Sequence, residues 1–121
     1  MQNAAQAYGS IAKQTTNPRE LEADLLLKAA ARLKAIQDAW EQSKPELDDA
    51  LLYNRKLWTI FLTSATSSDN PLPTDVRQNV ANLGLFVINH TLSVMSDPRP
   101  ERLSTLININ RELAAGLRGS V

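Results

Sequence analysis

Apolar residues recur every three or four positions along most of the chain, and prolines and short polar clusters divide this pattern into five segments. Such a spacing places the apolar side chains on one face of an α-helix. The pattern predicts helices over residues 2–13, 18–43, 46–65, 73–95 and 100–117. The connections between them are short, so neighbouring helices should run mostly antiparallel. We therefore expect an all-α fold, a compact bundle of about five helices that forms a single domain over residues 1–121.

The predicted helix over residues 46–65 has the widest apolar face. One line along this helix contains Leu47, Leu51, Asn54, Trp58, Phe61 and Ala65. The face is widened to about half of the circumference by Ala50, Tyr53, Leu57 and Ile60. A helix with so broad an apolar face either packs against more than one neighbour or offers part of its surface to a partner.

The predicted helix over residues 73–95 is apolar nearly all round. Its main stripe contains Val76, Val80, Leu83, Val87, His90 and Val94. Large apolar residues also lie outside that stripe, at Leu85, Phe86, Ile88 and Leu92. The β-branched residues around 85–88 would also suit a strand, but the long helical period favours a helix. Because this helix has so little polar surface, we expect it at the centre of the bundle.

Two asparagines, Asn54 and Asn110, occupy positions on the apolar stripes of their helices. A buried amide that lacks hydrogen-bond partners loses about 1–3 kcal/mol, so both residues need an explanation. One interpretation is that they fix the register of the bundle, paired with each other or with His90. The other is that Asn54 and Trp58 line a groove that receives a helix of another protein. The sequence leaves both open.

The composition narrows the class of protein. Apolar residues make up 43% of the chain and charged residues 21%, which is typical of a folded domain. The formal net charge is zero, so no large electrostatic field draws the protein to nucleic acid or to a membrane. The chain has no cysteine, which excludes disulfides and thiol chemistry. With no secretory signal and no span of membrane length, a cytoplasmic protein is expected.

Sites for chemistry are sparse. The single histidine, His90, has no neighbours at metal-ligand spacing, and there is no glycine-rich phosphate loop or paired acid that suggests catalysis. We expect no enzyme activity, no cofactor and no metal. His90 is expected as a hydrogen-bonded core or boundary residue, with a pH-sensitive contact as the alternative. Arg111 and Arg118 are seven residues apart and share a helix face, which keeps direct contact with RNA as an alternative function.

One ordered set of residues resembles a known family. Residues 54–61 follow the pattern N-x-x-L-W-x-x-F, and residues 70–80 follow N-x-L-P-x-x-V-R-x-x-V. Tyr8 stands near the start, and residues 20–33 read ELEADLLLKAAARL. Together they resemble the FlaF family, flagellar biosynthesis regulators of alphaproteobacteria, from Ala5 to about Leu113.

The resemblance implies a small cytoplasmic helical protein needed for flagellin production and export. It implies a chaperone that binds an amphipathic terminal helix of flagellin in an apolar groove, a link to the FlbT regulator, or both. Direct contact with flagellin mRNA is the alternative. The short first helix, within residues 1–16, could shift when a partner docks. Partner contacts are expected at Tyr8, Tyr53, Asn54, Leu57, Trp58 and Ile60.

Overall fold

The computed structural model describes residues 18–119, and all regular secondary structure within them is helical. The elements in chain order are α2 (Pro18–Asp38), α3 (Trp40–Ser43), the 3-10 turn η1 (Lys44–Glu46), α4 (Leu47–Ala65), α5 (Thr74–Ser96), the 3-10 turn η2 (Pro100–Arg102) and α6 (Leu103–Leu117). This confirms the all-α class. The described part has four long helices, not five, because the helix predicted at residues 2–13 lies outside it together with Tyr8.

The helix predicted over residues 18–43 is interrupted. Ala39 leaves the helical conformation with φ −123° and ψ 50°, and α3 and η1 carry the chain through the turn into α4. Pro45 lies in η1, where its missing N–H group breaks no helical hydrogen bond. The interruption brings Trp40 to the edge of the core, where it packs half-buried.

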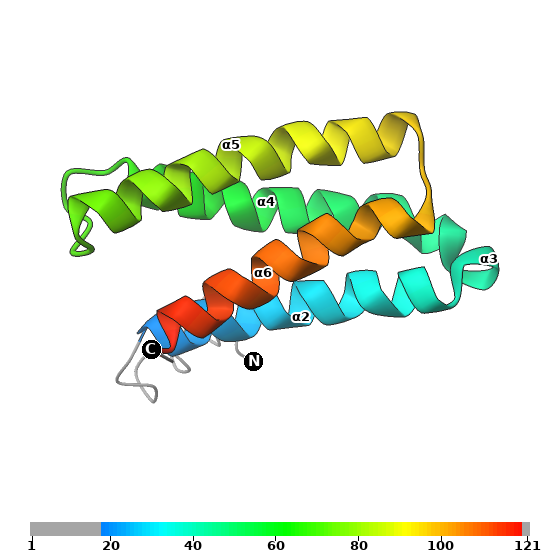
Figure 1. Cartoon of the computed structure of the whole chain (residues 1–121), viewed down its shortest axis with the longest axis horizontal. Helices are drawn as coiled ribbons and strands as arrows, with labels where there is room; N and C mark the ends of the chain where they lie inside the picture. Colours follow the sequence, from blue (N-terminus) through cyan, green and yellow to red (C-terminus); the bar gives the residue numbers. More distant parts are fainter. Residues whose placement is uncertain (1–17, 120–121) are drawn as a thin grey trace, which may run out of the picture.

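The four long helices form two antiparallel pairs, α2 with α6 and α4 with α5, joined mainly through contacts between α2 and α4 (Figure 1). α5 and α6 approach each other near the short connection through η2. They then separate toward the end of the bundle that holds the start of α2 and the end of α6 (Figure 1).

Most of the core lies where α2, α4 and α6 meet, and one face of α5 adds to it. Its largest fully buried apolar side chains are Trp58, Leu26, Leu33, Leu51, Leu103, Leu106, Val87 and Val94. α6 closes over the α2–α4 pair because its apolar face follows a regular helical period, from Leu103 through Ile107 to Ala114. The bundle is thus built mainly on α2, α4 and α6, and α5 packs on one side of α4 and buries Val87 and Val94 there.

The prediction that α5 occupies the centre of the bundle is wrong. Only one face of α5 is buried, through Val80, Gly84, Val87, Thr91 and Val94. Leu85 is 54% exposed, Phe86 47% and Leu92 50%. α6, rather than α5, covers the α2–α4 pair, so α5 has one main neighbour and leaves much apolar surface in water.

Candidate functional site

A buried network of hydrogen bonds joins α6 to α4 and α2. The Asn110 side-chain amide donates to Asn54 Oδ1 at 2.7 Å and to the Leu26 carbonyl at 3.3 Å. The Trp58 indole N–H donates to Asn110 Oδ1 at 2.8 Å. The side chains of all three polar residues are fully buried. Of the partners left open by the sequence, the two asparagines thus pair with each other.

His90 takes no part in this network. Its Nε2 lies 3.0 Å from the Arg102 carbonyl oxygen, and its ring stacks on Phe86 with centroids 5.5 Å apart. His90 is half-buried, which confirms a hydrogen-bonded boundary residue. Asn54 keeps one unused group, because its Nδ2 has no hydrogen-bond partner within the described chain.

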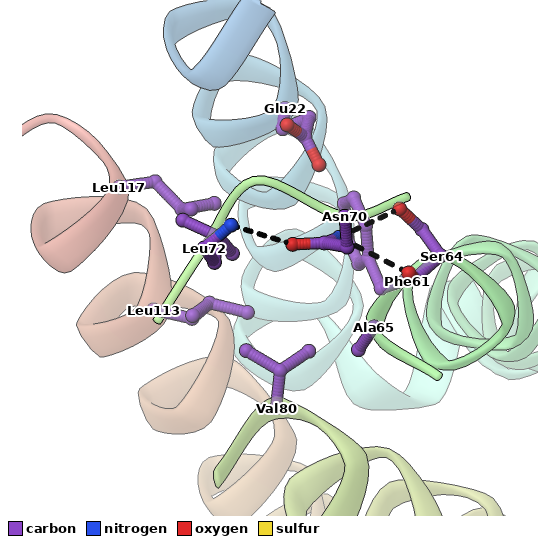
Figure 2. A pocket seen from close by; sticks show the side chains of 9 residues that line it. All are labelled: Glu22, Phe61, Ser64, Ala65, Asn70, Leu72, Val80, Leu113 and Leu117. Atoms are coloured by element: carbon purple, nitrogen blue, oxygen red, sulfur yellow. Dashed lines mark hydrogen bonds between the residues drawn. The ribbon is translucent and has the colours of Figure 1, made fainter. Parts of the chain in front are cut away.

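The loop between α4 and α5 is held by the side chain of Asn70. Its Nδ2 donates to the Ser64 carbonyl at 3.0 Å and to Ser64 Oγ at 3.1 Å, and its Oδ1 accepts from the Leu72 N–H at 2.9 Å. The carbonyls in the last turn of a helix lack partners within the helix, so Asn70 also caps α4. These bonds fix the loop so that Leu72 turns toward the bundle (Figure 2).

Arg77, at the start of α5, completes the cap. Its Nε donates to the Ala65 carbonyl at 2.9 Å and its Nη2 to the Ser67 carbonyl, also at 2.9 Å. The pattern N-x-L-P-x-x-V-R thus has a structural explanation. Asn70 and Arg77 cap α4, and Leu72 and Pro73, which lie between them in the pattern together with Val76, direct the loop into the next helix.

Three adjoining hollows lie at the end of the bundle where α2 begins and α4 ends. The innermost has a volume of about 20 Å³, and Val80, Leu113 and Leu72 point into it (Figure 2). The outer two have volumes of about 360 and 370 Å³. Glu22 of α2 and Ser64 of α4 line all three, so the hollows form one continuous depression.

We call this depression the end groove. The residues that define it here are Pro18, Glu22, Leu25, Leu57, Ile60, Phe61, Ser64 and Leu72. Most of these side chains are apolar, and Ile60 on the rim is 64% exposed. An open apolar groove between two helices can receive the apolar face of a third helix.

The end groove contains a half-buried acid. Burial raises the pKa of the Glu22 carboxyl above its ordinary value, and the nearby positive charge of Arg19 opposes that shift. Among the residues lining the three hollows, Glu22 and Arg19 are the only ones with ionisable side chains. A partner helix with a basic or amide group beside its apolar face would compensate the carboxylate. No group of three His, Cys, Asp or Glu residues in the described part of the chain could hold a metal ion.

The predicted contact residues lie at different depths below the protein surface. Leu57 and Ile60 line the end groove. Tyr53 is 40% exposed and lies on α4 two turns before Ile60, on the same side of the helix. Asn54 and Trp58 are fully buried, so they support the groove from within.

Several groove residues were not predicted from the sequence. Glu22, Ser64 and Leu72 come from three separate segments, and only the chain reversal after α4 brings them together. The pattern around Asn70 was the available signal. It marks a fixed loop, but it does not say which helix the loop faces.

Three of the four arginines near and along α6 make contacts within the described chain. Arg118 pairs with Asp24 of α2, and Arg99 pairs with Asp97 at 2.6 Å. Arg102 donates to the Ser93 and Asp97 carbonyls at 3.0 and 2.8 Å. The fourth, Arg111, is exposed on α6.

Of three comparisons with known proteins, one gives a match, to a protein-family model. Comparison with curated proteins and with solved structures gives no significant match. None of the described helices combines the length and the apolar character needed to cross a membrane. The family model described as "Flagellar protein FlaF" matches residues 4–117, nearly the whole chain, and so includes both patterns that build the end groove. The chain belongs to the FlaF family of flagellar proteins.

Proposed function

We propose that this protein is a cytoplasmic regulator of flagellar biosynthesis that binds a terminal amphipathic helix of flagellin in the end groove. In this role it is an export chaperone without catalytic activity. The observation that carries the proposal is the groove itself, an open apolar surface whose walls include Leu57, Phe61 and Leu72. Those residues belong to the two sequence patterns that distinguish the chain.

The shape and chemistry of the groove suit a helix. An amphipathic helix offers apolar side chains at i, i+3, i+4 and i+7, and the groove offers a row of apolar walls from Leu25 to Leu72. Ile60 is exposed enough to contact such a helix without rearrangement of the bundle. The groove is short, so we expect micromolar affinity, the range of a transient carrier.

Glu22 adds specificity to this proposal. A half-buried carboxylate loses solvation further when an apolar helix covers it, unless that helix supplies a positive charge or an N–H donor. We therefore expect the bound helix to carry Lys, Arg, Asn or Gln next to its apolar positions. Coupling to FlbT is the second part of the proposal, because a groove that is either free or filled gives FlbT two states to distinguish.

Gel filtration with light scattering tests the proposal. The full-length protein, mixed with monomeric flagellin at about 20 µM, should form a one-to-one complex that is lost when the terminal helices of flagellin are deleted. Ile60→Glu should abolish the complex. Leu52→Glu is the matched control, because Leu52 lies on the same helix, is 41% exposed and is not among the lining residues of the groove. A complex that survives both the truncation and Ile60→Glu would contradict the proposal.

Direct binding to flagellin mRNA has less support. It needs positive charge free to meet phosphates, whereas Arg118 is paired with Asp24 and Arg99 with Asp97. Binding to leader RNA that falls steeply with salt and is lost in Arg111→Glu would favour this alternative over the groove.

A further inference from the structure

α5 carries a second apolar surface, separate from the end groove. Ala81, Leu85, Ile88, Leu92 and Met95 follow one another at intervals of four and three residues. This alternation is the heptad spacing by which one helix packs along another. Leu85 and Leu92 are 54% and 50% exposed, and the other three are half-buried. We call these five residues the α5 seam.

The stretch of α5 that carries the seam lacks charged residues. Between Gln78 and Ser96 the chain contains no Lys, Arg, Asp or Glu, although charged residues make up 21% of the whole. Water-facing sides of surface helices normally carry charges, whereas the cores of protein interfaces are depleted of them. The seam therefore has the composition of an interface rather than of a solvated helix face.

We propose that the α5 seams of two copies of this chain pack antiparallel about a two-fold axis and form a homodimer. A two-fold axis that places Leu85 opposite Ile88 of the second copy also places Ala81 opposite Leu92. Small side chains then meet large ones, and the central pair is filled by two branched residues. The seam is thus complementary to itself, as a two-fold interface must be.

The charges at the two ends of α5 favour this antiparallel arrangement. Arg77 and Asp97 are the first charged residues beyond the uncharged stretch. The two-fold axis that pairs Leu85 with Ile88 brings Arg77 of one copy within one residue of the level of Asp97 of the other. Antiparallel pairing also places the positive end of each helix dipole beside the negative end of the other, which is favourable. Arg77 keeps its positive charge while it caps α4, and Asp97 shares its negative charge with Arg99 of its own chain. Parallel pairing would instead bring Arg77 beside Arg77, so the like charges disfavour that orientation.

Sedimentation equilibrium of the full chain over a concentration series from about 1 to 200 µM tests the dimer. The wild-type chain should shift from monomer to dimer, and Leu85→Glu with Leu92→Glu should remain monomeric and helical throughout. Ile60→Glu is the control, because Ile60 is more exposed than either leucine but belongs to the end groove. It should dimerise like the wild type. A wild-type monomer at 200 µM, or a dimer unaffected by the two seam substitutions, would overturn the proposal.

Cysteine crosslinking tests the orientation, because the chain has no cysteine of its own. Ala81→Cys and Leu92→Cys proteins, mixed and oxidised, should crosslink to each other at least tenfold faster than either crosslinks to itself. In the antiparallel arrangement two copies of residue 81 lie about 11 residues, or roughly 16 Å, apart along the helix axes. Preferential crosslinking of Ala81→Cys to itself would refute the antiparallel dimer.

Discussion

Replacement of Asn110 by alanine should be the most damaging single change of a polar residue in this bundle. The Asn110 side chain accepts a hydrogen bond from Trp58 and donates to Asn54 and to the Leu26 carbonyl. All of these contacts lie where no solvent reaches, because the side chains of all three polar residues are fully buried. Alanine cannot replace any of these bonds, and water cannot enter without a polar, roomy cavity.

The size of the loss follows from the buried polar groups that the substitution leaves without a hydrogen-bond partner. The Trp58 indole N–H loses its acceptor, and Asn54, whose Nδ2 already lacks a partner, loses its remaining bond. Each of these two buried groups, once unpaired, destabilises the fold by about 1–3 kcal/mol. The Leu26 carbonyl is not counted, because it keeps its backbone hydrogen bond within α2. The expected loss is therefore about 2–6 kcal/mol, a large part of the roughly 5–15 kcal/mol by which a typical domain is stable.

Urea unfolding followed by circular dichroism at 222 nm measures this loss. With a slope of about 2 kcal/mol/M, the midpoint should fall by about 1–3 M. Asn108→Ala on the same helix is the matched control, because Asn108 is exposed, and it should change stability by less than about 0.5 kcal/mol. If Asn110→Ala unfolds at the same midpoint as Asn108→Ala, the buried network does not hold α6 on the bundle.

Three further substitutions test other parts of the structure. Gly84→Ala should raise the free energy of unfolding by about 0.5–1 kcal/mol, because alanine favours the helix and the added Cβ would lie at an ordinary contact distance, 3.4 Å, from Leu62 Cβ. A lower free energy of unfolding would mean that α4 and α5 pack too closely here for a methyl group. Asn70→Ala should cost about 1 kcal/mol and speed proteolysis of the loop, and unchanged cleavage would contradict its capping role. Glu22→Gln should match the wild type in thermal unfolding below pH 4.5 and become slightly more stable above it. Folding raises the pKa of this carboxyl, so the wild type loses stability as the pH rises through the pKa of the folded state. Identical pH profiles of wild type and Glu22→Gln would show that folding does not raise this pKa.

Much of the fold was predictable because prolines and polar clusters mark its breaks. The helix predicted over residues 46–65 begins one residue before α4 and ends with it. The helix predicted over residues 73–95 begins and ends one residue before α5. The helix predicted from residue 100 begins at Leu103, because its first residues form the 3-10 turn η2. Proline cannot occupy the interior of a helix, so these limits follow from local chemistry alone.

The position of α5 could not be predicted in the same way. An apolar helix surface means that something covers it, but not whether the cover is the chain itself or another molecule. Leu85 and Leu92 would suit a central helix as well as an interface. The difference is decided by α6, whose regular stripe and buried Asn110 make it the better cover for α2 and α4. That competition between helices is a tertiary effect.

The candidate site was predictable only in part. Leu57 and Ile60 were expected to contact a partner, and both line the end groove. Glu22 lies near the start of α2, where the helix dipole favours an acid, so its position in the sequence already has a simple explanation that hides any role in a groove. Its second role depends on Leu72 and Ser64 lying beside it, and that neighbourhood is created by the loop that Asn70 folds.

The pattern N-x-x-L-W-x-x-F combines two roles on adjacent sides of one helix. Asn54 and Trp58 are four residues apart and point into the network with Asn110, whereas Leu57 and Phe61, also four apart, are turned toward α2 and the end groove. The same turn of helix therefore both fixes α6 on the bundle and forms the groove wall. The end groove lies beside this turn, between α2 and α4, so under the proposed function a partner helix would enter it without disturbing the buried contacts of Asn54 and Trp58.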